Sequence, residues 1–386
     1  MPSIFDSKYF NAEVFGRYLE TVPRVRQNAF LSAGILRTRT DLKTQFSAQT
    51  GGNYISVPMT GLIGGEALNY DGTTNVTSDT IDSYIQSMIV VGRMKAWKEK
   101  DFTFDITGKN FMEEIAKQVV AYWDDIDQAT IIAELQGIFG VSTDKFNVRH
   151  THDISDTSSP YVGPTTLNTA IQKAAGANKN IFTMAVMHST VATNLENLEI
   201  LEYRKQSDSE GIQRSIALAD WNGRTVLVDD DVPTVDGYFA ATESTPGALK
   251  IVASGATGAQ VNLATVTAAA FHPADAAANQ YVVEGTKYTT YVLGQGAFDY
   301  CDCGVKEPNE PYRDPKTSGG IDELITRQRK LFAPRGFSFV QPSPAIISPT
   351  DAQLKTAARW SIVKNTDGSK YFDTKAIPFV QIISRG

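Results

Sequence analysis

The feature that most constrains the fold is a long amphipathic segment, Asn110–Gly140. Its apolar residues recur at steps of three and four, which is the period of one face of an α-helix. The members of this stripe are Met112, Ile115, Val119, Trp123, Ile126, Ile132 and Leu135. The spacing predicts one helix of about 28 residues, roughly 42 Å long. We expect its acidic residues Glu113, Asp124 and Asp125 to lie on the solvent face rather than to bind a metal.

Before this helix the pattern is that of strands without a core of their own. Asn53–Met59 alternates apolar and polar residues, and Ser83–Thr103 is a long extended run. The residues between them are rich in Gly, Thr and Asn, which is typical of a loop. The segment 41–103 therefore predicts a long β-hairpin. Because a two-stranded hairpin is only marginally stable in water, we expect a neighbour to cover it.

The first forty residues mix aromatic and charged side chains, and Asn11–Val22 has helical spacing. An isolated helix of this length is marginal. We therefore expect its apolar face to rest on another element or on another chain.

After the long helix, helical and strand patterns alternate. Thr165–Asn178 and Thr190–Arg204 read as helices, whereas Asn180–Ser189 and Gly223–Val228 read as strands. This alternation predicts a mixed α/β domain. Residues 237–285 are crowded with Ala, Gly, Thr and Ser, so we interpret them as an insertion with two short strands.

The remaining chain returns to strands. Thr286–Val305 reads as a strand pair, and Lys306–Gly320 is a loop rich in Pro and Gly. Ser348–Trp360 has the pattern of a capped helix. The chain is expected to close with a hairpin that turns at Asp367-Gly368, because Asp-Gly is a strong hairpin signal.

The charge distribution restricts the classes of partner. The net charge of the 386 residues is −7, and no block of Lys and Arg is present. Sequence-specific binding of nucleic acid needs such clusters and is therefore not expected. No run approaches the roughly 18 apolar residues of a membrane-spanning helix, so no membrane partner is expected.

Cysteine and histidine give no strong chemical motif. Cys301 and Cys303 are the two cysteines, and two residues apart on a strand they cannot form an ordinary disulfide. Without a second pair they do not predict a zinc site, so we expect them to pack on a strand face. His150 and His152 form a His-x-His pair that lacks a third ligand nearby, and we interpret both as loop residues without function.

Three consecutive carboxylates, Asp229, Asp230 and Asp231, follow the strand that ends at Val228. Carboxylates at strand ends bind hard cations in several enzyme classes. Successive strand residues, however, point to opposite faces, so three in a row do not converge on one ion. A turn closed by Pro233 explains the run equally well. We expect no catalytic residue, no metal and no cofactor.

The order of these elements resembles that of the major capsid proteins of tailed bacteriophages. Phe182–Leu195 is similar to the strand and helix of the family's axial domain, and Gly223–Pro233 to the turn that follows. Tyr288–Tyr300 resembles the family's Tyr-x-Thr-Tyr-Leu-x-Gly-x-Gly-Ala strand, and Asp322–Phe339 the strand pair that closes its peripheral domain. The resemblance covers nearly the whole chain. The insertion is longer than in the simplest members.

The resemblance implies an α+β fold with a long hairpin (the E-loop), a long spine helix, a peripheral (P) domain and an axial (A) domain. Its implied boundaries are an N-terminal arm at 1–40, the E-loop at 41–103, a P-domain with the spine helix at 104–157 and an A-domain at 158–300. Residues 301–386 would return to the P-domain and carry its Pro-rich loop and the C-terminal hairpin.

The resemblance also implies self-assembly into hexamers and pentamers of an icosahedral shell that encloses double-stranded DNA in the virion. The shell would be assembled in the host cytoplasm with a separate scaffolding protein and a portal, and a decoration protein is a further candidate partner. The implied contact residues are Phe5, Tyr9, Phe15, Met59, Leu62, Leu68, Tyr70, Pro308, Tyr312 and Arg313.

Two alternatives stay open at this point. One is an encapsulin-like nanocompartment shell of the same fold, which packages an enzyme cargo instead of DNA. The other is a metal-dependent enzyme that uses Asp229–Asp231. The first differs from a phage capsid in what the particle encloses, and the second would form no shell.

Overall fold

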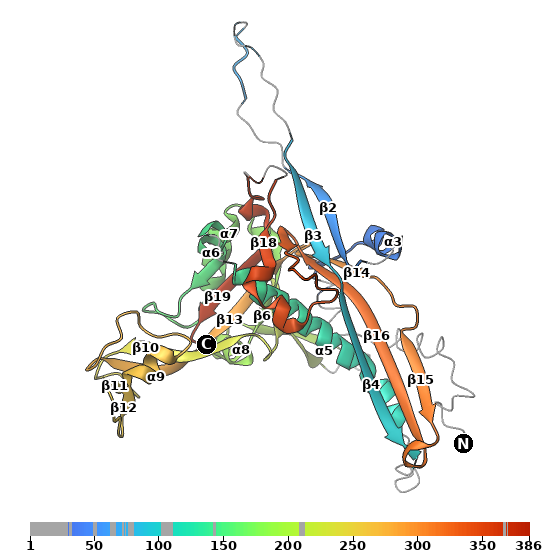
Figure 1. The fold of residues 1–386 in the computed structure, drawn as a ribbon. Helices are drawn as coiled ribbons and strands as arrows, with labels where there is room; N and C mark the ends of the chain where they lie inside the picture. The colour runs from blue at the N-terminus through green and yellow to red at the C-terminus, as the bar shows by residue number, and fades with distance from the viewer. Residues whose placement is uncertain are drawn as a thin grey trace. The chain divides into compact units, whose positions relative to one another are not determined.

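A computed structural model describes residues 30, 33–48, 52–61, 67–71, 73, 75, 81–101, 111–141, 144–207, 213–365, 368 and 370–386. The chain divides into two compact units (Figure 1). Unit 1 comprises Met1–Ser142 and Gly296–Ile377, and unit 2 comprises Thr143–Gln295 and Pro378–Gly386. In the described part of the chain, no helix is long and apolar enough to cross a membrane.

Unit 1 is built on a five-stranded sheet around one long strand, β16 (Ile321–Pro334). β14 (Phe298–Asp302), β15 (Asn309–Asp314) and β4 (Val91–Lys100) all pair with β16 in antiparallel fashion. β1 (Leu36–Thr38) pairs with β14 in parallel. Along β16, residues 321–326 pair with β15 and residues 330–334 pair with β14. β4 pairs with residues 321–330 of β16.

The predicted long helix is confirmed as α5 (Phe111–Phe139), of 29 residues. Val119, Val120 and Trp123 pack in one cluster with Leu324 of β16, and Trp97 of β4 lies against the same cluster. The apolar stripe of the helix therefore covers one face of the sheet.

The prediction that Asp124 faces solvent is wrong, because its side chain is buried, and only Asp125 is exposed. Part of the acidic face thus lies inside the unit. The side chain of Glu113 is outside the described residues.

The predicted hairpin is present, but it is shorter than expected. β2 (Tyr54–Thr60) pairs with β3 (Ser83–Ile89) from Tyr54↔Ile89 to Thr60↔Ser83. The remainder of the extended run is β4, which leaves the hairpin and joins β16. The reason is burial: Trp97 has a partner surface on α5, which the hairpin does not offer.

Residues 40–48 form a helix, α3 (Thr40–Ala48), and not the predicted strand. Leu42 and Phe46 are four residues apart, so a helix places both on one face, and both are buried against Cys301 and Leu331. The four-residue spacing of these two buried side chains therefore favours a helix over a strand.

The predicted C-terminal hairpin is present only near its turn, where the Asn365 amide donates to the Lys370 carbonyl at 2.9 Å and the Phe372 amide to the Val363 carbonyl at 2.8 Å. The pairing predicted for the strands beyond this turn is wrong. β18 (Trp360–Ile362) pairs with β17 (Phe337–Phe339), and a single bridge joins Lys364 to Tyr371. The last strand, β19 (Phe379–Ser384), instead pairs with β13 of unit 2. Phe379, Val380 and Ile382 are fully buried, so β19 needs a place inside a sheet. Asp367 lies outside the described residues.

The helix expected over Ser348–Trp360 is also shorter. α10 spans Asp351–Leu354 and begins with a capping box between Thr350 and Gln353. A 3-10 turn, Ala357–Arg359, follows it.

Unit 2 holds a ten-stranded mixed sheet centred on β13 (Tyr281–Gly294), β6 (Phe182–Met187) and β9 (Arg224–Val228). The other strands are β5 (Thr151–Asp153), β7 (Glu202–Ser207), β8 (Gln213–Trp221), β10 (Thr234–Ala241), β11 (Leu249–Val252), β12 (Gln260–Asn262) and β19. The helices are α6 (Asp144–His150), α7 (Thr166–Ala175), α8 (Ser189–Asn197) and α9 (Leu263–Ala268). The apolar faces of α7 and α8 share one buried cluster with β6, β9, β13 and β19.

The insertion leaves and re-enters the unit through a two-stranded ribbon. β10 and β13 pair from Thr234↔Tyr288 to Ala241↔Tyr281. Its base carries two opposed glycines: a Cβ on Gly237 would overlap Phe271, and a Cβ on Gly285 would lie 2.7 Å from the Phe239 ring. The two phenylalanine rings are 4.6 Å apart between centroids, so the glycines make room for this aromatic pair.

Candidate assembly surfaces

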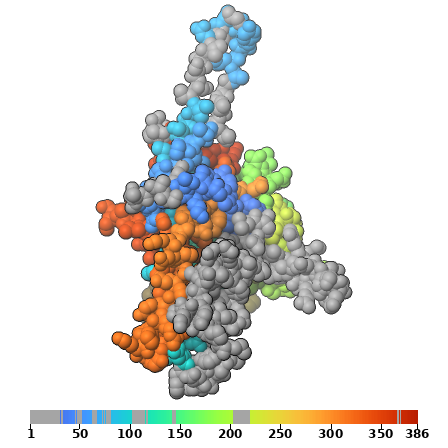
Figure 2. All heavy atoms as spheres, turned by 90° about the vertical axis from the view of Figure 1, so that its right-hand side faces the viewer, coloured from blue at the N-terminus to red at the C-terminus, as the bar shows by residue number. Residues whose placement is uncertain are grey.

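The loop of the hairpin carries two exposed residues among the predicted contacts. Tyr70 is fully exposed at 101%, and Leu68 is 49% exposed. Met59 is half-buried and lies opposite Tyr84 in the ladder. In Figure 2 the light-blue end of the hairpin stands uncovered on the face shown. Exposed aromatic and aliphatic side chains at a loop tip are typical of contact surfaces.

Four of the predicted contacts cannot be placed. Phe5, Tyr9, Phe15 and Leu62 lie outside the described residues. Their assignment stays a prediction from the sequence.

A second surface lies along β15, because residues 309–314 of the predicted Pro-rich loop form this strand and pair with β16. Pro308 is exposed and Tyr312 is 54% exposed. Arg313 is bound within the chain: its guanidinium donates to Asp322 at 2.8 Å and to Asp101 at 2.7 Å. Hydrogen bonds to these two carboxylates raise the pKa of Arg313. Arg313 therefore joins the ends of all three strands.

The backbone closes the same end of the sheet. The Asp101 amide donates to the Gly320 carbonyl at 3.1 Å, and Gly320 has a φ of 124°. A Cβ at that position would overlap the Asp101 carboxylate, so only glycine fits. The turn between β15 and β16 is thus held in one shape, and Tyr312 lies exposed on β15 beside it.

The three aspartates after β9 diverge, and each has a local role. Asp229 is buried and accepts a hydrogen bond from the Asp231 amide at 3.0 Å. Asp230 accepts from the Ser189 amide at 3.2 Å, at the start of α8. Hydrogen bonds from Ser189 lower the pKa of Asp230. This geometry favours the turn interpretation over the metal site, and no metal-holding group of three ligands occurs among the described residues.

The histidine pair does not act as one site. His150 lies at the end of α6, fully buried, with Nδ1 2.7 Å from the Phe379 carbonyl and its ring stacked on Phe146. His152 lies on β5, where burial lowers its pKa. The interpretation of His150 as a loop residue is wrong, because helix α6 carries it into the core.

The two cysteines are free and buried, as expected for packing residues. They lie in one cluster with Leu42 and Phe46. Burial raises the pKa of the Cys303 thiol to about 12. A thiol in such a site is a poor nucleophile.

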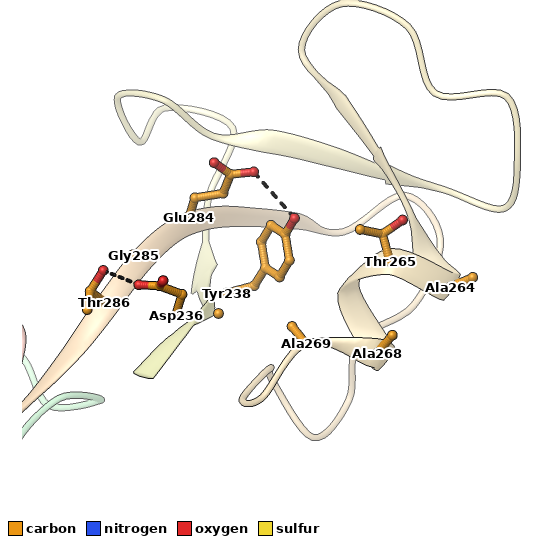
Figure 3. Close-up of a pocket in the computed structure, with 10 residues that line it drawn as sticks. Asp236, Tyr238, Ala264, Thr265, Ala268, Ala269, Glu284, Gly285 and Thr286 are labelled. Atoms are coloured by element: carbon orange, nitrogen blue, oxygen red, sulfur yellow. Dashed lines mark hydrogen bonds between the residues drawn. The ribbon is translucent and has the colours of Figure 1, made fainter. Parts of the chain in front are cut away.

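The insertion contains an open groove of about 940 Å³ between the β10–β13 ribbon and α9 (Figure 3). Two carboxylates lie on its ribbon side: Asp236 accepts from Thr286 at 2.6 Å, and Glu284 accepts from Tyr238 at 3.3 Å. Small residues of α9, such as Ala268, form the opposite side. Apart from the small residues of the insertion, nothing in the sequence pattern predicts this groove.

Sequence reasoning also missed a buried ion pair in unit 1. Lys330 of β16 donates to Asp127 of α5, and their side chains are only 6% and 8% exposed. Gln328 donates to the same carboxylate at 3.0 Å. Asp127 lies one turn after Trp123 on the buried face of α5. This position in the helical period could have indicated that its carboxylate is buried.

Comparison with known proteins agrees with the resemblance seen in the sequence. No family model matches the chain. The major capsid protein of Bacillus phage SPP1 is 24% identical over 374 residues, which cover 97% of this chain and 95% of that protein. Among solved structures, the capsid of Ralstonia phage GP4 matches with a TM-score of 0.50 at 8% identity, covering 92% of this chain and 88% of that one.

These comparisons confirm two predictions. The resemblance to tailed-phage major capsid proteins is confirmed by a relative that matches from end to end. The α+β capsid fold is confirmed by the structural match. The contact residues and the domain boundaries stay predictions.

Proposed function

We propose that this chain is a major capsid protein of the tailed-phage type, a structural protein whose copies build the shell of a virion head. One observation carries the proposal: a relative named as a major capsid protein matches 97% of this chain and 95% of its own length. The chain thus serves as a building block and not as an enzyme.

The architecture suits assembly by contacts between unlike surfaces. Such head-to-tail contacts close into rings when the rotation between copies permits it. The hairpin offers Leu68 and Tyr70, which no described residue of the same copy buries. We assign this tip to a contact with the adjacent copy and the loop around Tyr312 to a contact between several copies. These contacts organise hexamers and pentamers.

The finer partners follow from the same role. As a phage head protein, the chain would assemble with a separate scaffolding protein and with a portal for DNA entry, and a decoration protein is a further partner. The shell encloses double-stranded DNA without reading its sequence, consistent with the net charge of −7 and the lack of basic clusters. Assembly takes place in the host cytoplasm.

The two alternatives are less favoured. The nanocompartment shell shares the fold, but the full-length relative is a phage protein. The enzyme alternative needs converging carboxylates, whereas Asp229 and Asp230 bond to different backbone amides.

Sedimentation velocity of the purified full-length chain, followed by nuclease treatment and nucleic-acid extraction, tests the proposal. We expect capsomers or shell-sized particles. Particles from infected cells should contain nuclease-protected DNA, whereas a protein cargo in its place would favour the nanocompartment. A chain that stays monomeric at high concentration, with or without a scaffolding protein, would contradict the proposal.

A further inference from the structure

A carboxyl group of the long helix is buried without a hydrogen bond. Glu134 of α5 is 1% exposed, and its Oε2 atom has no hydrogen-bond partner. Ala133, Leu135 and Ile138 around it on the helix are also buried. An ionised carboxylate in such a place is very costly, so the group becomes protonated instead. Burial raises the pKa of Glu134 well above its ordinary value.

One cation acts on Glu134. The charge of Arg93, at the start of β4, opposes the effect of burial on the pKa of Glu134. Arg93 is already engaged: it donates to the Pro349 carbonyl at 2.8 Å and to Asp351 Oδ1 at 2.6 Å. The carboxylate that binds Arg93 is thus on α10. Glu134 is a second possible acceptor, to which Arg93 does not donate.

The segment 348–354 bridges β4 and α5. Ser348 accepts a hydrogen bond from the Gly92 amide at 3.0 Å, and Arg93 holds Pro349 and Asp351. At its other end, Leu354 lies so close to α5 that a Cβ on Gly137 would overlap the Leu354 carbonyl. Gly137 is three residues after Glu134, on the same side of the helix. The segment therefore contacts Arg93 of β4 and, at Gly137, the side of α5 that carries Glu134.

The other charged groups on elements that pack against α5 have partners or lie at the surface. Arg329 donates to Asn53, and Lys330 binds Asp127. Lys355 is exposed and Arg359 is partly exposed. β18 (Trp360–Ile362) carries no charge. The competition for Arg93 is therefore between Asp351 and Glu134.

We propose that Glu134, Arg93 and Asp351 form a pH-dependent latch that holds segment 348–354 between β4 and α5. While Glu134 is protonated, Arg93 binds Asp351 and the bridge is closed. When Glu134 loses its proton, the new buried carboxylate attracts Arg93 away from Asp351, and the bridge loosens. This property belongs to the single subunit, so it does not depend on shell formation.

The direction of the effect follows from proton binding. Glu134 binds its proton more tightly in the folded than in the unfolded chain. Its contribution is therefore complete below the unfolded pKa, about 4.5, and is lost as the pH rises towards the folded pKa. Stability should fall with pH in this window.

The test compares the full-length wild type with Glu134→Gln, which keeps the shape and carries no titratable group. Unfolding by urea is followed from pH 4.5 to pH 9, and Glu307→Gln, at an exposed position, is the matched control. We expect the unfolding equilibrium constant of the wild type to rise relative to that of E134Q by up to about tenfold per pH unit. The control should follow the wild type. A ratio that stays constant with pH would overturn the proposal.

Two further measurements do not rely on E134Q folding well. The wild type at neutral pH should show the infrared carbonyl band of a protonated carboxylic acid, and its absence would overturn the proposal. In Asp351→Asn, Arg93 is released towards Glu134, so the folded pKa of Glu134 should move down, and with it the upper end of the pH window in which stability falls. An unchanged pH would show that Arg93 does not link the two carboxyl groups.

Discussion

At the scale of single residues, the largest effect of a substitution on stability is expected at the buried ion pair Lys330–Asp127. Its side chains are 6% and 8% exposed, so removal of one charge leaves the other in a site that cannot hydrate it. We expect Lys330→Met to lower the free energy of unfolding by about 3–5 kcal/mol. Urea denaturation measures the change.

A double variant separates pairing from packing. Lys330→Met with Asp127→Leu removes both charges and should restore most of the stability lost in the single variant. If the double variant is as unstable as the sum of both single variants, the charges do not act as a pair.

The cysteines give a chemical test of burial. With the pKa of Cys303 at about 12, only roughly one thiol in ten thousand is ionised at pH 8. We expect iodoacetamide to leave both cysteines unmodified in the native chain and to alkylate both in urea. Mass spectrometry reads the result, and rapid native alkylation of Cys303 would contradict its placement in the core.

The sequence predicted some of these residues and missed others for a physical reason. The turn after β9 was predicted, because a strand end, adjacent carboxylates and a proline are all local features. The partner of Asp127 is 203 residues away on β16, so no local pattern indicates it. Glu134 was missed as well, because a single carboxyl residue within a helix gives no sign of the elements that bury it.

At the scale of elements, α5 was predictable along its whole length because its apolar period is sustained over many turns. β19 was not, since its hydrophobic pattern suits either a hairpin or a central strand. Only the buried place beside β13 selects between them. The boundary between β3 and β4 was not predictable either. The extended run is continuous in sequence, so nothing in it indicates that β3 pairs with β2 whereas β4 pairs with β16.

The close approach of α5 to α10 can be tested at Gly137. An added Cβ would overlap the Leu354 carbonyl and the Trp360 indole. We expect Gly137→Ala to destabilise the chain by about 1–3 kcal/mol. In an unobstructed helix the same change stabilises by roughly 0.5–1 kcal/mol.

Thermal unfolding measures this change. Ala121→Gly, at an exposed position of the same helix, is the control for intrinsic helix propensity, and it should cost about 1 kcal/mol. A neutral or stabilising Gly137→Ala variant would show that the two helices are further apart.

A substitution of Arg313 tests how the ends of β4, β15 and β16 are held together. Its side chain is 37% exposed, so its ion pairs are partly screened by solvent. We expect Arg313→Ala to change the global stability by less than about 1 kcal/mol. Hydrogen exchange of residues 309–322 should nevertheless speed up, because the ends of β4, β15 and β16 lose their common partner. Lys306→Ala, at an exposed position shortly before β15, should leave the exchange unchanged.

At the scale of the whole molecule, the hairpin has a covered base and an exposed tip. Ile55 and Met88 of its strands pack in a buried cluster of the same chain, whereas Tyr70 at the tip is fully exposed. We propose that a neighbouring copy covers this tip. We expect Leu68→Ser with Tyr70→Ser to reduce particle yield strongly, as measured by sedimentation, while urea unfolding of the subunit stays unchanged. Val148→Ser, an exposed apolar position of unit 2, is the control.

Electron cryomicroscopy of particles formed by the full-length chain tests whether the chain builds a shell. We expect closed shells in which this fold repeats around five-fold and six-fold positions, with the hairpin tip of each copy lying on its neighbour. Discrete small oligomers without capsomers or shells, under conditions that include a scaffolding protein, would contradict it.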